Sequence, residues 1–76
     1  MRVLFTVMSK PDKAEVIMKK LRQEKEVIEA HTIKDGKFDV IAWIGVPSLE
    51  HYRMFIERIA KFEEIDDFES FITVDS

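Results

Sequence analysis

Hydrophobic residues repeat first with a period of two residues and then with a period of three to four residues, and these two periods predict the first two elements of the chain. In residues 2–8, apolar side chains point to alternate faces, which is typical of a β-strand. From about Pro11 to Glu24 they recur every three or four positions, which predicts an amphipathic helix with lysines on its wet side. We expect this helix to begin within Ser9–Asp12, with Pro11 in its first turn.

The middle of the chain carries a hairpin signal. The pair Asp35-Gly36 lies between two apolar runs, residues 26–33 and 38–46, and an Asp-Gly pair in this setting is typical of a tight turn. We therefore expect this turn to connect two antiparallel strands, the second of which is almost wholly apolar.

The last third of the chain repeats the helix-then-strand order. Ser48 is a natural N-cap, and a second apolar stripe with helical spacing follows it to about Phe62. Residues 65–74 predict the last strand. The order strand–helix–strand–strand–helix–strand predicts one α+β domain, residues 1–76. We expect a ferredoxin-like βαββαβ sandwich in which two helices cover one face of a four-stranded antiparallel sheet.

The other face of this sheet is expected to be apolar as well. If Val3, Phe5 and Val7 face the helices, their neighbours in the same strand face away from them. The apolar residues that then face away are Leu4, Met8, Ile41, Trp43 and Phe71. Such a patch is too large to leave in water, and a small chain without disulfides gains stability from oligomerisation. We therefore predict a homodimer that packs sheet to sheet.

Composition argues against several classes of protein. The net charge of −3 argues against direct binding to nucleic acid, and no apolar run approaches the roughly 18 residues of a membrane helix. The absence of cysteine excludes disulfides, thiolate metal sites and cysteine nucleophiles. The N-terminus has no cleavable leader signal, so we expect a cytoplasmic protein. Abundant Lys and Glu without any Asn are typical of a thermophilic source.

Catalytic and metal chemistry have few candidates in the sequence. His31 and His51 are the only histidines, and two histidines without a third ligand make a poor metal site. The sequence contains no nucleophile–base motif, phosphate-binding loop or metal-binding motif. It therefore predicts no catalytic residue, no metal and no cofactor.

Three segments resemble one family of transcription regulators. They are residues 32–39, 46–53 and 65–74, and in order and spacing they are similar to the effector-binding module of the Lrp/AsnC regulators. The resemblance implies a module that pairs sheet to sheet, assembles further into forms such as octamers, and binds an amino acid where dimers meet. Because the first strand begins at Arg2, it also implies a stand-alone module without a DNA-binding domain, with full-length regulators as its partners.

The resemblance also assigns ligand-binding residues. By family position they are Gly36, Phe38, Asp39, Ser70, Phe71 and Ile72. Asp39 can pair with the α-ammonium group of the ligand or, alternatively, fix the hairpin and its register. Gly36 lets the backbone approach the ligand, and Ser70 offers a hydroxyl. Asp35 stands where the family usually has a small or hydroxyl residue. This departure favours a basic or atypical ligand, or a loss of binding.

Two other functions fit the same fold. One is a ligand-free scaffold that joins full-length relatives into an assembly. The other is a dimeric α+β-barrel enzyme, a cofactor-free oxygenase or isomerase, in which His31, Asp39, Trp43 and His51 line a cleft between sheet and helices. An effector module has its polar groups at the hairpin and the last strand, whereas an enzyme needs an enclosed cavity within one subunit.

Overall fold

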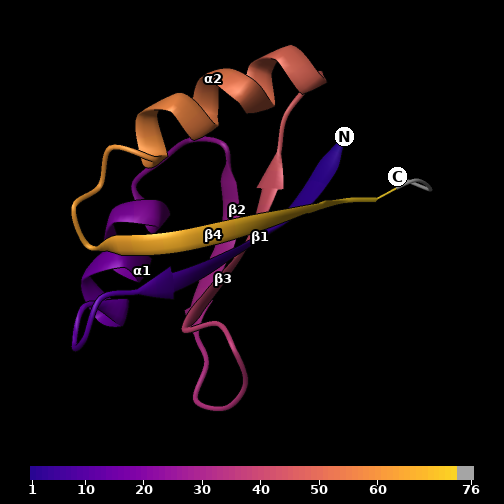
Figure 1. The fold of residues 1–76 in the computed structure, drawn as a ribbon. Coiled ribbons are helices and arrows are strands. Elements are labelled where there is room, and N and C mark those ends of the chain that lie inside the picture. The colour runs from indigo at the N-terminus through magenta and orange to yellow at the C-terminus, as the bar shows by residue number, and fades with distance from the viewer. Residues whose placement is uncertain (74–76) are drawn as a thin grey trace.

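Four strands and two helices follow one another in the predicted order. The computed structural model describes residues 1–73. Its elements are β1 (Arg2–Ser9), α1 (Ala14–Arg22), β2 (Val27–Thr32), β3 (Val40–Gly45), α2 (Leu49–Ile59) and β4 (Ile65–Ile72). The strands form one antiparallel sheet in the order β2-β3-β1-β4, with α2 on one side of it and the β2–β3 loop on the other (Figure 1). This arrangement confirms the ferredoxin-like α+β fold.

The core lies between the sheet and the two helices. Val3, Phe5 and Val7 of β1 are completely buried, and their partners on β3 are buried with them. The ring of Phe5 packs edge-on against Phe55 of α2, with 6.0 Å between the ring centres. The buried apolar side chains are Val3, Phe5, Val7, Ile17, Leu21, Ala30, Val40, Ala42, Ile44, Val46, Tyr52, Phe55 and Ile59.

Helix α1 begins later than the sequence pattern predicts. Its first residue is Ala14, so the predicted start within Ser9–Asp12 is wrong. Asp12 has a φ of 63°, in the left-handed region that aspartate adopts more readily than most residues, and no helix runs through it. The reason is tertiary. The amide of Lys10 donates to the carbonyl of Glu64 (2.8 Å), which ties the segment before α1 to the start of β4.

Helix α2 begins as predicted. The Ser48 hydroxyl oxygen accepts a hydrogen bond from the amide of His51 (3.3 Å), which makes Ser48 the N-cap. The helix ends at Ile59 and not at Phe62. The amide of Phe62 donates to the Ile59 carbonyl (3.0 Å) in the turn that follows, and its ring packs on the core from there.

The connection between β2 and β3 is a wider loop than the predicted turn. The two strands pair antiparallel, which confirms the hairpin. The amide of Ile33 donates to the carbonyl of Asp39 (2.8 Å) and closes loop 33–39, so Phe38 lies in the loop and not in β3. Gly36 within this loop has a φ of 101°, a conformation that residues with a side chain rarely adopt.

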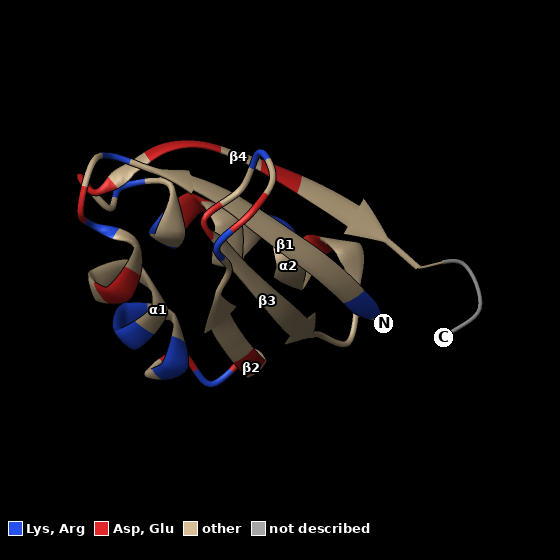
Figure 2. Ribbon diagram, turned by 90° about the horizontal axis from the view of Figure 1, so that it is seen from below, with Lys and Arg blue, Asp and Glu red and all other residues tan. Residues whose placement is uncertain are grey.

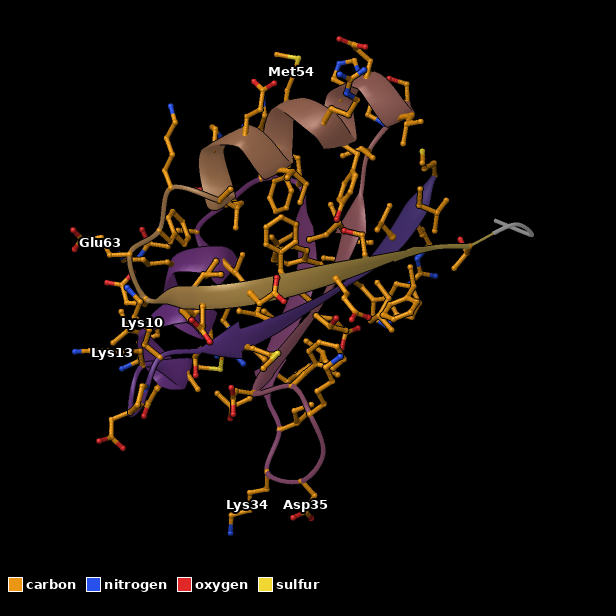
Figure 3. All side chains as sticks on the ribbon, viewed as in Figure 1. Lys10, Lys13, Lys34, Asp35, Met54 and Glu63 are labelled. Carbon is orange, nitrogen blue, oxygen red and sulfur yellow. The ribbon has the colours of Figure 1, made fainter. Side chains whose placement is uncertain are left out.

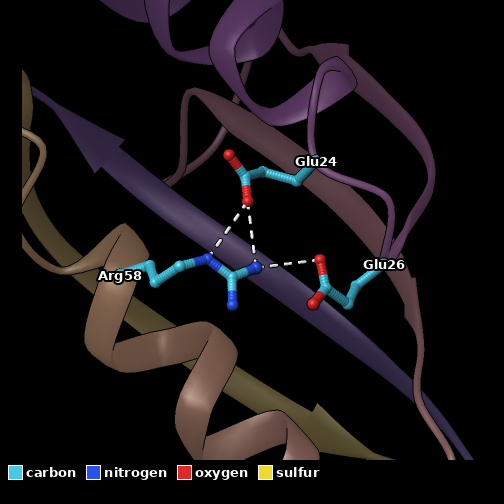
Figure 4. A network of polar contacts seen from close by, with 3 residues as sticks. All are labelled: Glu24, Glu26 and Arg58. Carbon is cyan, nitrogen blue, oxygen red and sulfur yellow. Dashed lines mark hydrogen bonds and ion pairs between the residues drawn. The ribbon is translucent and has the colours of Figure 1, made fainter.

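Arg58 joins the end of α2 to the connection between α1 and β2. Its Nε and Nη2 atoms donate to Glu24 Oε1 (3.3 and 3.0 Å), and Nη2 also donates to Glu26 Oε1 (2.9 Å; Figure 4). Burial pushes the pKa of the Glu26 carboxyl up, but the hydrogen bonds from Arg58 and the backbone, together with the Arg58 charge, hold this pKa below its ordinary value. The network therefore stabilises the ionised form of Glu26.

Replacing Arg58 by glutamine is expected to lower the free energy of unfolding by up to about 1 kcal/mol near neutral pH, because solvent screens this partly exposed network. The Glu26 carboxyl has a lower pKa in the folded protein than in the unfolded chain. Its contribution is therefore complete above about pH 4.5 and is lost as the pH falls through the lower, folded pKa. Urea unfolding of both proteins between about pH 3 and pH 7 measures the effect.

The two stability curves should converge at acid pH. Arg53→Gln is the matched control, because Arg53 lies on the same helix and has no ion-pair partner among residues 1–73. A difference between wild type and Arg58→Gln that stays constant at every pH would contradict the assigned role of the Glu26 charge.

Candidate functional site

The open face of the sheet, on the side away from the helices, carries an apolar row across three strands. Leu4 of β1 lies opposite Trp43 of β3 and Phe71 of β4, so these three side chains stand side by side. Leu4 and Trp43 are half-buried, and Phe71 is 49% exposed. The guanidinium of Arg2 lies 5.0 Å from the centre of the Trp43 ring, a cation–π contact. An exposed apolar row of this kind is typical of an interaction surface.

Polar groups border this row on the same face. Ile41 of β3 lies opposite Thr6, whose hydroxyl donates to the carbonyl of Glu69 (3.0 Å). Met8 lies opposite Asp67, at the end of β1. All five apolar residues predicted to face away from the helices therefore lie on the open face, and the charged residues of β4 lie along its margin (Figure 2).

Three of the predicted ligand-binding residues, Gly36, Phe38 and Asp39, lie in loop 33–39 at one end of the sheet. The Oδ2 atom of Asp39 accepts a hydrogen bond from the amide of Ser9 (2.8 Å), where the register between β1 and β4 shifts. This bond fixes the base of the loop to the end of β1. At Gly36, apart from its two neighbours in the chain, no residue has an atom within 4 Å of the position that a Cβ would occupy, so the backbone there is open to a ligand.

The rest of the loop points away from the sheet. Lys34 and Asp35 lie at its tip and extend into solvent (Figure 3). Lys37 is the exception, because its Nζ atom lies 3.3 Å from Glu69 Oε1 on β4. This exposed ion pair joins the loop to the margin of the open face.

The other three predicted ligand-binding residues, Ser70, Phe71 and Ile72, end β4 at the opposite end of the sheet. Ile72 lies opposite Val3, whereas Val7 of the same strand lies beside the start of β3 and the loop. Four residues along a strand span about 13 Å. One chain therefore forms two separate groups of predicted ligand residues and does not bring them together. The predicted end of the last strand at Val74 lies outside the described residues.

A cavity of about 330 Å³ opens between α2 and β4, and we call it the α2–β4 cavity. Ser70 lies on the helix side of β4 between the larger Phe68 and Ile72, and its small side chain leaves room there. The lining residues are Tyr52, Arg53, Ile56, Glu57, Phe68 and Ser70. Its volume falls in the range of small-molecule sites.

The hydroxyls of Tyr52 and Ser70 are hydrogen-bonded to each other at this cavity. Burial raises the pKa of the Tyr52 phenol, and the hydrogen bond with Ser70 offsets only part of that effect, so the phenol stays neutral at physiological pH. The sequence predicts Tyr52 only as one position of an apolar helical stripe. A hydroxyl on that stripe is the one signal that could have pointed to this pair.

A second cavity, of about 450 Å³, lies at the start of α1 and is lined by Lys10, Lys13, Glu63 and Glu64. Figure 3 shows Lys10, Lys13 and Glu63 extending outward there. Lys20 Nζ donates to Glu64 Oε1 (2.9 Å), and this hydrogen bond is the main cause that lowers the pKa of the Glu64 carboxyl. Side chains of both charge signs thus line this cavity, and their charges partly neutralise each other.

The four residues of the enzyme hypothesis are not brought together. His31 and Trp43 lie on the open face, and His31 Nε2 is 2.8 Å from Glu29 Oε1. His51 is exposed at the start of α2, where its Nδ1 contacts Ser48. The predicted cleft between sheet and helices that would hold these side chains is therefore wrong. Within residues 1–73, no three His, Asp or Glu side chains are placed to hold a metal ion.

Neither helix in the described part of the chain is long and apolar enough to cross a membrane.

Several solved structures share this fold. A hypothetical protein from Pyrococcus horikoshii, PHS023, is 26% identical, with a TM-score of 0.90 over 99% of this chain and 90% of its own. FFRP-DM1 is 27% identical, with a TM-score of 0.90 over 96% of this chain and 97% of its own. Escherichia coli AsnC is 18% identical and shares the fold, with a TM-score of 0.89 over 99% of this chain and 51% of its own.

No curated protein matches the chain significantly. The family model of the Lrp/AsnC ligand binding domain matches residues 2–76, which is nearly the whole sequence. This chain therefore belongs to the Lrp/AsnC ligand-binding-domain family.

Proposed function

We propose that this chain is a regulatory module that binds a free amino acid at interfaces between its own copies and thereby modulates transcription regulators of the Lrp/AsnC family. Membership of a ligand-binding family gives the class of function. The observation that carries the proposal is the structure of loop 33–39. It presents a carboxylate and an open stretch of backbone at the edge of an uncovered sheet face.

Asp39 has the geometry of an ammonium acceptor. Its Oδ2 atom holds the amide of Ser9, and its other oxygen has no hydrogen-bond partner among residues 1–73. The hydrogen bond to Ser9 orients the carboxylate before a ligand arrives, which reduces the entropic cost of binding. The open backbone at Gly36 lies three residues away and supplies N–H donors for an α-carboxylate.

The site is shared between copies of the chain. Gly36, Phe38 and Asp39 lie at one end of the sheet and the segment 70–72 lies at the other, so a ligand that touches both groups needs residues from two chains. The apolar row of the open face supports a sheet-to-sheet dimer, and further contacts between dimers then bring loops to the ends of β4 strands. Ligand binding stabilises such an assembly by mass action.

Asp39→Asn tests this proposal more sharply than Asp39→Ala. Asparagine keeps an oxygen that accepts from the Ser9 amide and removes only the charge that pairs with an ammonium group. In a thermal-shift panel of the twenty amino acids, a ligand at about 100 times its Kd stabilises the native state by about 2.7 kcal/mol. That corresponds to roughly 10–20 °C for a domain of this size. We expect one selective shift in the wild type and its loss in Asp39→Asn.

Asp66→Asn is the matched control, because Asp66 is an exposed carboxylate of β4 outside the predicted set. Asp39→Asn should keep the unliganded melting temperature within a few degrees of wild type, and Asp66→Asn should keep the ligand shift. If none of the twenty amino acids raises the melting temperature of a wild-type protein that is still oligomeric, the result would contradict the effector function and support the ligand-free scaffold.

A further inference from the structure

The α2–β4 cavity has properties that the shared site does not need. It lies on the helix side of the sheet, and residues of a single chain line it. Tyr52 and Ser70 line it with two hydroxyls that are hydrogen-bonded to each other. Ile56 and Phe68 are half-buried and give it apolar walls. A ligand in this cavity would therefore place an apolar group against these two side chains.

Two opposite charges stand at the mouth of the cavity. Arg53 and Glu57 lie one turn apart on the same face of α2, both are exposed, and both line the cavity. Neither makes an ion pair with another residue in the range 1–73. The contrast with Arg58 on the same helix is direct, because two glutamates hold that guanidinium. Arg53 and Glu57 are therefore available to a ligand that carries charges of both signs.

We propose that the α2–β4 cavity is a second, intrasubunit binding site for a small zwitterion with an apolar side chain, the chemistry of a free aliphatic amino acid. The guanidinium of Arg53 pairs with the carboxylate, which it can hold through two parallel N–H donors. The carboxylate of Glu57 accepts from the ammonium group. The aliphatic side chain packs between Ile56 and Phe68 and removes apolar surface from water.

This site has only Ser70 in common with the shared site proposed above. It uses neither loop 33–39 nor a second copy of the chain, and its charged contacts come from α2, which supplies none of the predicted ligand-binding residues. The hydroxyl of the predicted residue Ser70 is hydrogen-bonded to Tyr52, and both residues line the cavity.

Isoleucine δ1-methyl resonances report the two sites separately, with L-leucine as the probe. Ile56 lines the α2–β4 cavity, Ile33 begins the loop of the shared site, and Ile17 is a completely buried control. We expect L-leucine to shift Ile56 and to do so equally in Asp39→Asn. A shift of Ile33 without Ile56 would overturn this inference and support the shared site, and no shift of Ile56 at millimolar ligand would overturn it outright.

Two ligand analogues separate the roles of the two charges. 4-Methylpentanoate lacks the ammonium group of leucine, and 3-methylbutylamine lacks its carboxylate. Arg53→Gln should weaken the binding of L-leucine and of 4-methylpentanoate about tenfold and leave the binding of 3-methylbutylamine unchanged. Glu57→Gln should weaken the binding of L-leucine and of 3-methylbutylamine and leave the binding of 4-methylpentanoate unchanged. Lys61→Gln and Glu50→Gln, exposed charges outside the cavity lining, should change nothing. Equal losses in all four variants would overturn the assigned pairing.

Discussion

Phe71→Glu is expected to dissociate the assembly of this chain into single subunits. Phe71 ends the apolar row that Leu4 and Trp43 continue across the open face. Burial of one phenylalanine contributes about 1.5–3 kcal/mol, and a two-fold interface contains the residue twice. The substitution therefore removes roughly 3–6 kcal/mol of association free energy. It also buries two carboxylates, so the dimer should bind at least about a hundredfold more weakly.

Met54→Glu is the matched control for this prediction. Met54 is 55% exposed, close to the 49% of Phe71, but it lies on the outer surface of α2 (Figure 3). Both substitutions put a charge on an exposed apolar position, so both should leave the fold of one subunit nearly unchanged. Sedimentation velocity should show the wild type and Met54→Glu as oligomers and Phe71→Glu as a monomer. An unchanged sedimentation coefficient for Phe71→Glu, or equal dissociation of both variants, would contradict the sheet-to-sheet interface.

Phe5→Ala is expected to unfold the isolated subunit. Phe5 is completely buried, and its ring centre lies 6.0 Å from that of Phe55 and 5.4 Å from that of Phe68. Truncation of a buried phenylalanine to alanine costs about 3–5 kcal/mol, because the cavity left behind adds to the lost transfer free energy. A core of this size rarely supplies more than about 3–5 kcal/mol in all. The substitution thus removes most of the stability that one chain holds.

Urea unfolding followed by circular dichroism measures this loss. In the Phe71→Glu background, where the chain is a monomer, Phe5→Ala should abolish the unfolding transition. Phe5→Leu retains more of the buried volume, so it should keep an unfolding transition, with a urea midpoint below that of the Phe71→Glu protein. Leu49→Ala is the control at an apolar side chain that is 51% exposed, and it should change the free energy of unfolding by at most about 0.5 kcal/mol. A loss below about 1 kcal/mol for Phe5→Ala would contradict the central place of this ring.

Strand β4 lies between the two surfaces that carry these proposals. Ser70 and Phe71 are consecutive residues, and side chains along a strand alternate between its faces. Ser70 therefore borders the α2–β4 cavity, and Phe71 stands in the apolar row on the opposite side. The two proposals therefore concern opposite faces of β4 within one subunit.

The sequence by itself determined the type and order of the elements and the faces of the sheet on which the apolar residues of β1, β3 and β4 lie. These properties depend on local periodicity, which the chain carries at every position. The alternation in β1 placed Leu4 and Met8 on the face of the sheet opposite to that of Phe5. The side chain of Ser48 capped α2, and the apolar runs on either side of Gly36 formed a hairpin. The apolar residues of the open face could therefore be predicted, whereas the sequence pattern assigned no face to the residues of β2, such as His31.

Only the tertiary structure decided the polar contacts of the candidate sites. Asp39 and Ser9 are 30 residues apart, and Tyr52 and Ser70 are 18 residues apart, so strand register and helix packing determine whether these groups meet. The left-handed Asp12 is a further case, since it lies in a segment that the Lys10 amide ties to the carbonyl of Glu64, just before β4. Such contacts leave no period in the sequence. Each is a single pairing between distant residues, and its geometry exists only once the hydrophobic core has fixed the elements relative to one another.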